Sequence, residues 1–470
     1  MLKIFNTLTR EKEIFIPVEG RKVRMYVCGI TTYSDAHLGH ARTYVAFDII
    51  RRYLEYKGYD VFYVQNITDI DDKIIDAANK AGVSPFLYAE MYGKRCFEDM
   101  KKLGIRDANL YPKATEHVDD MINFIEKLIE KGYAYISEGD VYFTVRKFEG
   151  YGKLSKQNME QIIAGARVSG EGKINKEDFA LWKNAKPNEP KWQSPWGYGR
   201  PGWHIECSVM SSKYLGVPID IHGGGEDLIF PHHENEIAQS ETFFGKRFVN
   251  YWMHCGLLKI RGEKMSKSLG NIINLRDAIE EWGADNLRFF FASYHYRSPA
   301  DFSEESIGNA SNSLRRIVLM KEKLQEFAGE SKKFNRKELS KEEKNYLEDI
   351  KNIKINFEKA MDDDFNTPKA IEEIFNFVKR TNKFLMEKRN PSREVCRFAL
   401  DEFLKIANVL NIFQEKKIDE NLALMLAEKY GVREKNSEKI IEKIIEIRKE
   451  ARENKNYKLA DEIREDLKKI

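Results

Sequence analysis

A strand, a helix and a second strand follow one another near the N-terminus, and this unit constrains the fold more than any other part of the chain. Residues 23–28 form an apolar run, residues 39–57 carry apolar side chains at helical spacing, and Gly58 precedes a second apolar run at 59–64. Short links of this kind join parallel strands through a helix. The sequence therefore predicts an α/β fold with a Rossmann-like parallel sheet.

The rest of the chain divides into segments that have different sequence patterns. At 470 residues the chain is too long for one ordinary core, so several domains are expected. Short strands, a helix and a Pro/Trp/Gly-rich stretch predict an inserted α+β subdomain, and the pattern after Phe302 predicts an all-helical C-terminal domain. The predicted segments are the first Rossmann-like half at 1–110, the insertion at 111–202, the second half at 203–255, a linker with a lysine-rich loop at 256–302, a helical domain at 303–414 and a helical C-terminal segment at 415–470.

Composition limits the classes of protein that fit. Hydrophobic residues make up 42% and aromatic residues 12%, which is typical of a folded protein. There are 78 basic and 75 acidic residues, so a nucleic-acid partner would require a local basic face. The sequence has no signal-peptide pattern and no apolar run of membrane-spanning length. Its five scattered cysteines favour a reducing cytoplasm over a disulfide scaffold.

The segment His37-Leu38-Gly39-His40 lies where a strand turns into a helix. The N-terminus of a helix presents unpaired N–H groups and partial positive charge, which bind anions. Gly39 lets a nucleotide approach the backbone, and two histidines three residues apart can donate to charge that develops on a phosphate. The alternative interpretation is a pair of partly exposed histidines that cap the helix, and this motif alone does not decide between the two.

A second polar motif, Lys264-Met265-Ser266-Lys267-Ser268, follows Gly262. Two lysines there could close over a leaving pyrophosphate, with Lys267 reaching the region of the α-phosphate. A solvated charge run is the alternative. The two motifs stand in one chain more than two hundred residues apart, and their joint presence favours nucleotide chemistry.

Sulfur and imidazole groups make a third pattern. Cys28 ends the first strand, Cys207 comes from a distant segment, and His232 and Glu236 share one helix face because they are four residues apart. Two thiolates, an imidazole and a carboxylate make a plausible zinc site. The zincin pattern HExxH fails because Ile237 stands where its second histidine belongs. The spacing alone favours the alternative that both cysteines are small core residues.

These motifs resemble a known family. The pair of signatures resembles those of class I aminoacyl-tRNA synthetases, and further segments resemble the cysteinyl-tRNA synthetase family from the first residues to at least Asp301. They include Tyr26-Val27-Cys28-Gly29, Asn66-Ile67-Thr68-Asp69, Gly202-Trp203-His204-Ile205-Glu206-Cys207, His222-Gly223-Gly224-Gly225-Glu226-Asp227 and Pro231-His232-His233-Glu234-Asn235-Glu236. The resemblance implies ATP-dependent attachment of L-cysteine to its tRNA through a cysteinyl-adenylate.

The resemblance also implies site residues and cofactors. One zinc ion per chain is expected to select the substrate thiol, since zinc prefers a thiolate to a hydroxyl and a hydrophobic pocket separates cysteine from serine poorly. Magnesium is expected with ATP. The zinc ligands would be Cys28, Cys207, His232 and Glu236, and the cysteine pocket would include Thr68, Trp203 and His222. Gly39, His40, Asp227, Lys264 and Lys267 would bind ATP, with His37, His40, Lys264 and Lys267 stabilising the transition state.

Some features depart from the family or leave alternatives open. Ile30-Thr31-Thr32-Tyr33 replaces a Pro-Thr-Val-Tyr common in the family, and the strand-containing tail usual in the family does not follow Ile470, so the resemblance does not support anticodon reading by such a tail. The carboxylates Asp69, Asp71 and Asp72 could bind magnesium, but helix-dipole partnership is the favoured interpretation.

Three functions are compatible with these patterns. The leading one is an enzyme, expected to be a monomer with no membrane partner, whose partners are tRNA for cysteine, ATP and L-cysteine. The second is a cysteine-activating ligase with an amino-sugar acceptor, and the third is a non-catalytic RNA-binding paralogue. The long helical region after Phe302 favours the tRNA acceptor.

Overall fold

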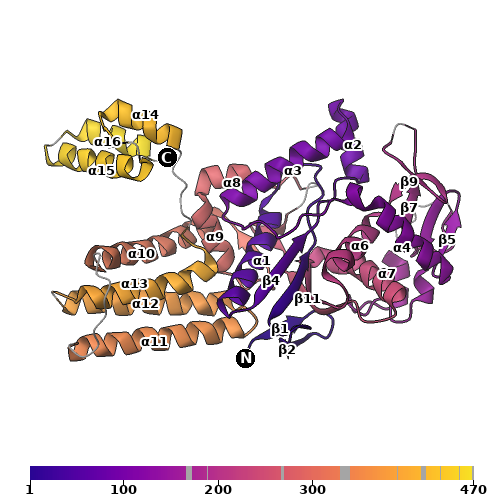
Figure 1. Ribbon diagram of the computed structural model, residues 1–470, viewed down its shortest axis with the longest axis horizontal. Helices are drawn as coiled ribbons and strands as arrows, with labels where there is room; N and C mark the ends of the chain where they lie inside the picture. Colours follow the sequence, from indigo (N-terminus) through magenta and orange to yellow (C-terminus); the bar gives the residue numbers. More distant parts are fainter. Residues whose placement is uncertain are drawn as a thin grey trace. The chain divides into compact units, whose positions relative to one another are not determined.

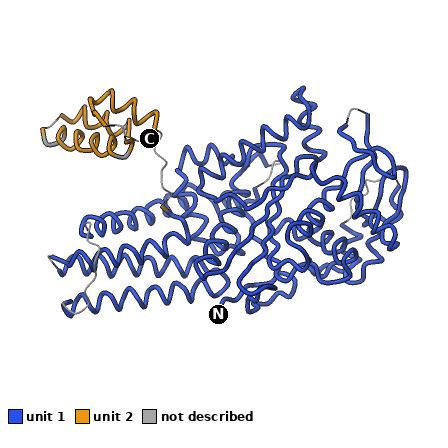
Figure 2. Tube along the Cα trace, in the orientation of Figure 1, with its two compact units in different colours: residues 1–412 blue, residues 413–470 orange. Residues whose placement is uncertain are grey.

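The structure is a computed structural model that describes residues 1–165, 172–187, 189–265, 269–328, 339–388, 390–413, 420–434, 436–454 and 456–467. The chain forms two compact units, residues 1–412 and 413–470 (Figure 2).

A four-stranded parallel sheet forms the centre of the first unit (Figure 1). Its order is β11-β10-β3-β4, and every pair is parallel, so the predicted Rossmann-like sheet is confirmed. The chain passes from β3 to β4 on one side and from β10 to β11 on the other, which makes the position between β3 and β10 a topological switch point. The strands are β3 (Lys22–Val27), β4 (Asp60–Gln65), β10 (Ile219–Gly225) and β11 (Val249–Cys255).

Helix α1 (Leu38–Tyr56) connects β3 to β4. Its predicted apolar stripe is buried, with Val45 at 0% and Ile49 at 3% exposure. The chain leaves the helix through Gly58, whose φ of 83° belongs to the left-handed region that glycine tolerates. At this end, Tyr53 Oη donates to Asp362 Oδ1 at 2.7 Å and Tyr56 Oη donates to Glu358 Oε1 at 2.8 Å. Both acceptors belong to α11 (Lys341–Asp362).

An antiparallel sheet of order β5-β6-β7-β9-β8 forms the inserted subdomain. Trp182 of β7 is fully buried, in a core that also includes Ile205 and Met210 of α6. This core joins the insertion to the helices that follow it. The elements are α4 (Val118–Glu130), β5 (Ala134–Ser137), β6 (Asp140–Phe143), α5 (Met159–Gly165), β7 (Phe179–Asn184), β8 (Trp192–Ser194), β9 (Gly197–Pro201), α6 (Trp203–Leu215) and α7 (Glu234–Phe244).

Smaller elements surround the parallel sheet. A β-hairpin begins the chain, two helices follow β4, and a three-stranded sheet of order β13-β12-β14 lies in the region that follows β11. They are β1 (Lys3–Asn6), β2 (Glu11–Ile14), α2 (Asp72–Ala81), α3 (Pro85–Lys102), β12 (Leu258–Ile260), β13 (Glu263–Lys264), α8 (Leu275–Trp282), α9 (Ala284–Ala292) and β14 (Ala300–Phe302).

Four long helices complete the first unit and confirm the predicted helical domain (Figure 1). The fully buried Arg288 of α9 binds Asp48 of α1 and donates to the carbonyl oxygen of Leu410 at 2.7 Å, so the long helices are anchored to a helix of the parallel-sheet region. The helices are α10 (Glu304–Ala328), α11, α12 (Thr367–Glu387) and α13 (Arg393–Leu410).

The second unit contains α14 (Glu420–Tyr430), α15 (Ser437–Glu453) and α16 (Tyr457–Leu467). Its small core includes Leu426, Ile440 and Ile463. In the parts of both units that the structure describes, no helix combines the length and apolar character needed to cross a membrane. The predicted domain boundaries stay predictions.

Candidate functional site

The predicted sulfur and imidazole ligands meet at the switch point of the parallel sheet. Cys28 directly follows β3, α6 supplies Cys207, the chain entering α7 supplies His232, and the first turn of α7 supplies Glu236. In open α/β sheets the carboxyl ends of the strands at such a point form the usual ligand crevice. The topology therefore explains why these distant segments converge.

Cys28, Cys207, His232 and Glu236 each offer one ligand atom, and these atoms lie within 4.8 Å of one another. Cys28 Sγ is 3.7 Å from Cys207 Sγ and 3.6 Å from Glu236 Oε1. The same Glu236 oxygen is 3.1 Å from His232 Nε2. All four residues are buried. Two sulfurs, a nitrogen and an oxygen suit a zinc ion.

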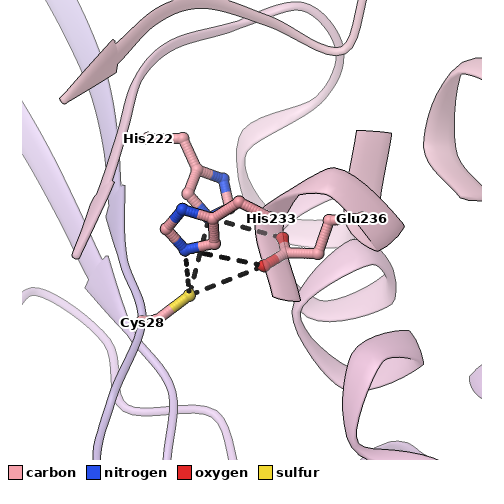
Figure 3. Close-up of side chains that lie close together, drawn as sticks. All are labelled: Cys28, His222, His233 and Glu236. Atoms are coloured by element: carbon pink, nitrogen blue, oxygen red, sulfur yellow. Dashed lines mark hydrogen bonds and ion pairs between the residues drawn. The ribbon is translucent and has the colours of Figure 1, made fainter. Parts of the chain in front are cut away.

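A second group shares two members of the first. Figure 3 shows Cys28 and Glu236 together with His222 of β10 and His233, which lies directly before α7. Cys28 Sγ is 3.2 Å from His233 Nε2 and 3.6 Å from His222 Nε2. His222 was predicted to contact the substrate, whereas sequence reasoning missed His233. The adjacent His232-His233 pair was a signal that could have found it.

An outer layer of imidazoles and aromatic rings orients these groups. His233 Nδ1 lies 2.8 Å from His254 Nε2, and His254 Nδ1 lies 2.8 Å from Thr7 Oγ1. His232 Nδ1 contacts His204 Nδ1 at 3.0 Å, while the ring of Trp203 stacks on His232 with centroids 4.3 Å apart. Partners on the second ring nitrogen fix the orientation of an imidazole. Neither His204 nor His254 was predicted.

Burial sets the protonation of this region. Desolvation lowers the pKa of His204 and of His254 to about 3, so both rings are neutral at pH 7. Desolvation also raises the pKa of the Cys28 thiol and of the Glu236 carboxyl. A divalent cation reverses the second effect because it binds the deprotonated forms.

A polar group borders the candidate metal ligands at the end of β4. The Gly29 N–H donates to Asn66 Oδ1 at 2.8 Å, and Asn66 Nδ2 donates to Thr68 Oγ1 at 3.2 Å. Thr68 Oγ1 donates to Glu206 Oε2 at 2.8 Å. A Cβ at Gly29 would lie 1.6 Å from the carbonyl oxygen of Asn66, so this approach requires glycine. Sequence reasoning singled out Thr68 but missed Asn66 and Glu206.

The first signature motif begins α1. His37 is the N-cap, its ring stacks on that of His40 with centroids 3.6 Å apart, and each Nδ1 accepts the other residue's backbone N–H, at 3.3 and 3.4 Å. The Nδ1 atoms of both histidines therefore cap the helix, as the alternative interpretation of this motif predicts. The helix N-terminus that the motif forms is also the anion-binding geometry that the sequence predicts.

The two signature motifs meet in space. A Cβ at Gly39 would lie 2.8 Å from Cε of Met265, so the side chain of the second motif packs against the glycine of the first. The Leu38 N–H donates to Ile273 at 3.1 Å, and the Leu275 N–H donates to Ala36 at 2.8 Å. The backbone on both sides of His37 is therefore paired with the segment that follows the lysine-rich loop.

The remaining predicted residues lie toward solvent or outside the described chain. Lys264 is exposed on β13, and Asp227 is exposed two residues beyond β10. Lys267 lies outside the described residues, as do Ser266 and Ser268.

The three carboxylates considered for magnesium have protein partners. Asp69 accepts from the backbone and hydroxyl of Thr115, at 3.0 and 2.5 Å. Asp71 is the N-cap of α2 and accepts from the Lys73 N–H at 2.9 Å, in accord with the favoured interpretation. Asp72 binds Lys183 and Arg200.

The chain is similar to known proteins along its whole length. Residues 14–312 match the family described as tRNA synthetases class I (C) catalytic domain, and residues 356–414 match the DALR domain. The chain is 50% identical over 470 residues to the cysteine–tRNA ligase of Thermococcus gammatolerans, covering 100% of this chain and 96% of that protein. It is 51% identical over 474 residues to that of Pyrococcus horikoshii, with the same coverage.

Solved structures show the fold. A methionyl-tRNA synthetase from Mycobacterium tuberculosis in complex with methionyl-adenylate matches with a TM-score of 0.59 at 16% identity, over 84% of this chain and 90% of that one. The LeuRS of Agrobacterium radiobacter matches with a TM-score of 0.62 at 12% identity, over 85% of both chains.

Proposed function

Because the chain belongs to the cysteine–tRNA ligase family of class I aminoacyl-tRNA synthetases, and is thus an enzyme that attaches cysteine to its tRNA, we propose that Cys28, Cys207, His232 and Glu236 hold one zinc ion per chain. The observation that carries the proposal is the convergence of these four buried groups within 4.8 Å at the switch point. When bound, the ion supplies a soft coordination position that the thiol of cysteine fills and the hydroxyl of serine does not.

The groups beside this position form the amino-acid pocket. Thr68 lies at the inner end, His222 is fully buried next to Cys28, and Trp203 covers His232 with its ring. When the substrate cysteine is held by its sulfur at the inner end of the pocket, its carboxylate is directed out of the pocket. The binding energy is then used to orient the carboxylate toward the nucleotide.

ATP, which we propose enters with magnesium, occupies the other end of the site. The carboxylate of cysteine attacks the α-phosphate in line, giving the cysteinyl-adenylate and pyrophosphate. His37, His40, Lys264 and Lys267 stabilise the charge that develops on the phosphates, and Gly39 lets them approach the start of α1. Asp227 contacts the nucleotide. The 3′ hydroxyl of the tRNA then attacks the carbonyl carbon of the adenylate, which forms the ester of cysteinyl-tRNA and releases AMP.

The helical domain 303–414 binds the anticodon arm of the tRNA. A groove of about 840 Å³ between α10 and α12 supports this role. Its lining combines the half-buried ring of Phe375 with four exposed cations, and a basic groove with an aromatic ring suits RNA. The cations are Arg316, Lys323, Lys379 and Lys383.

The compartment and the assembly are part of the same proposal. The structure has five free cysteines, all buried, which suits a reducing cytoplasm. The groups proposed for cysteine and ATP all come from one chain. We therefore expect a monomer to be active, which gel filtration at assay concentration would test.

Cysteine-dependent ATP–pyrophosphate exchange tests the proposal directly. We expect exchange with cysteine, none above background with serine, and about one zinc per chain by elemental analysis. Exchange with cysteine by folded protein free of zinc would overturn the metal assignment. Equal exchange with serine would overturn the selectivity argument.

A further inference from the structure

Glu206 is a buried carboxylate that has more hydrogen-bonding capacity than the protein uses. It lies in the first turn of α6, directly before Cys207, and is 1% exposed. Its Oε2 accepts from Thr68 Oγ1 at 2.8 Å. Its Oε1, however, has no hydrogen-bond partner among the residues that the structure describes. Buried polar atoms are nearly always paired, so the orphaned oxygen marks a position for a ligand donor.

The neighbouring hydrogen bonds have only one consistent direction. The backbone N–H of Gly29 can only donate, so the atom of Asn66 that it meets is the amide oxygen. The NH₂ of Asn66 therefore faces Thr68 and donates to its hydroxyl oxygen. The single O–H of Thr68 is left to donate to Glu206. Glu206 must therefore be an acceptor at Oε2, and Oε1 stays available for a further donor.

Other carboxylates near the pocket are already in use. Asp69 accepts from Thr115, Asp71 caps α2, and Asp72 pairs with two cations. Glu236 belongs to the proposed zinc ligands. Among these acidic groups in the described chain, Glu206 is the one that combines burial, a position beside Thr68 and an orphaned oxygen.

The substrate carries a group that fits this position. Cysteine bears its sulfur and its α-ammonium group on neighbouring carbons, so the anchors for sulfur and nitrogen must be close together. Asn66 Oδ1 is 3.6 Å from Cys207 Sγ, and its Nδ2 is 3.2 Å from Thr68 Oγ1, so one side chain bridges from the sulfur end to the Thr68–Glu206 pair. A buried carboxylate is the usual partner of a buried ammonium.

We infer that Oε1 of Glu206 receives the α-ammonium group of the substrate, while Oε2 and Asn66 hold Thr68 in place. This subsite rests on the proposed function, because it takes its substrate from the site with Cys28 and Cys207. It adds a second point of recognition, specific for a primary ammonium next to a thiol.

The variant Glu206→Gln separates charge from hydrogen bonding. Burial raises the pKa of the Glu206 carboxyl, so its charged form would need the ammonium as a partner. Glutamine keeps a carbonyl oxygen for the hydroxyl of Thr68 but cannot form the carboxylate that the ammonium would stabilise. We expect the KM for L-cysteine and the inhibition constant of cysteamine, which has the thiol and the ammonium, each to rise by at least about tenfold. The inhibition constant of 3-mercaptopropionate, which lacks the ammonium, should change by less than about twofold.

Glu343→Gln serves as the matched control, because Glu343 is also a buried carboxylate that accepts hydrogen bonds, at Ser340 and Ser392 in the helical domain. It should leave the affinity for all three thiols unchanged. An equal loss for all three in Glu206→Gln would assign Glu206 to shaping the pocket and overturn the inference. Unchanged constants for all three would overturn it as well.

A measurement on the unaltered enzyme covers the case in which Glu206→Gln does not fold. Cysteamine should inhibit cysteine-dependent exchange at least about tenfold more tightly than 2-mercaptoethanol, which has a hydroxyl in place of the ammonium. Equal inhibition would overturn the ammonium subsite. Exchange and zinc content of the unaltered enzyme report separately on the proposed function, so failure of the subsite and failure of the zinc site remain distinguishable.

Discussion

The two ends of the site are built in opposite ways. The sulfur end is dry: Cys28, Cys207 and Glu236 are at most 5% exposed. The proposed nucleotide end is open, with Lys264 exposed on β13 and Asp227 exposed two residues beyond β10. Distinguishing sulfur from oxygen requires fixed donors in a desolvated pocket, whereas a phosphate carries enough charge to be held by exposed cations and a helix N-terminus.

The largest effect is expected at the buried end. Cys207→Ser replaces a soft ligand by a hard one and should lower cysteine-dependent exchange by more than about 100-fold, with loss of zinc. Pyrophosphate exchange and elemental analysis on one sample measure both effects. Cys396→Ser, at a buried cysteine of α13, is the matched control. Full activity with full zinc in Cys207→Ser would exclude Cys207 as a zinc ligand.

A substitution at the open end should lower the reaction rate without changing the stability of the fold. Lys264→Ala is expected to lower kcat for exchange by roughly 100-fold, because it removes a charge that stabilises the phosphates. The melting temperature and zinc content should not change, since Lys264 is exposed. Lys259→Ala, at an exposed lysine on the neighbouring strand β12, should keep the unaltered rate. Loss of zinc in Lys264→Ala would show that the two ends are not independent.

Acid should destabilise the buried end. The folded-state pKa of His254 is lowered to about 3 by burial, so the unfolded chain binds a proton between pH 3 and about 6.5 that the folded chain does not. Stability is therefore greatest above pH 6.5 and falls on acidification, by about 2 kcal/mol at pH 5 from this group. Urea unfolding of metal-free protein at pH 7.5 and pH 5 measures the loss. His254→Phe should lose less on acidification; an identical loss would exclude His254 as its source.

The smallest effect is expected at the exposed cations of the helical domain. Lys379→Ala with Lys383→Ala should weaken tRNA binding by roughly tenfold or less and reduce the dependence of affinity on salt. Filter binding of tRNA at several salt concentrations measures this. Exchange without tRNA should be unchanged, and the double variant Glu372→Ala with Glu387→Ala, in the same groove, is expected to strengthen binding slightly. If the dependence of tRNA affinity on salt concentration stayed the same, the tRNA would bind at another surface of the protein.

The sequence predicted the parts of the fold that depend on local pattern. The runs at 23–28 and 59–64 predicted the parallel strands because both faces of such a sheet are buried, and helical spacing predicted the region after Phe302. The convergence of Cys28, Cys207, His232 and Glu236 was expected from a family resemblance. Spacing had favoured two core cysteines.

Sequence reasoning could not find the residues that support the site. His254 is oriented by Thr7, and Glu206 is paired with Thr68, across 247 and 138 positions of the chain. Within their own segments, His254 and Glu206 have the pattern of ordinary polar residues of a strand or helix. Only the sheet order, which brings the segments together, gives these side chains partners.

Helix α1 has a mechanical consequence. It begins at the proposed phosphate-binding motif and ends where Tyr53 and Tyr56 contact α11, and its 19 residues make a rod about 28 Å long. A tilt of one degree imposed at the tyrosine end displaces the other end by about 0.5 Å, which is comparable to the tolerance of a catalytic hydrogen bond. Helix α1 therefore gives the long helices a direct mechanical connection to His37.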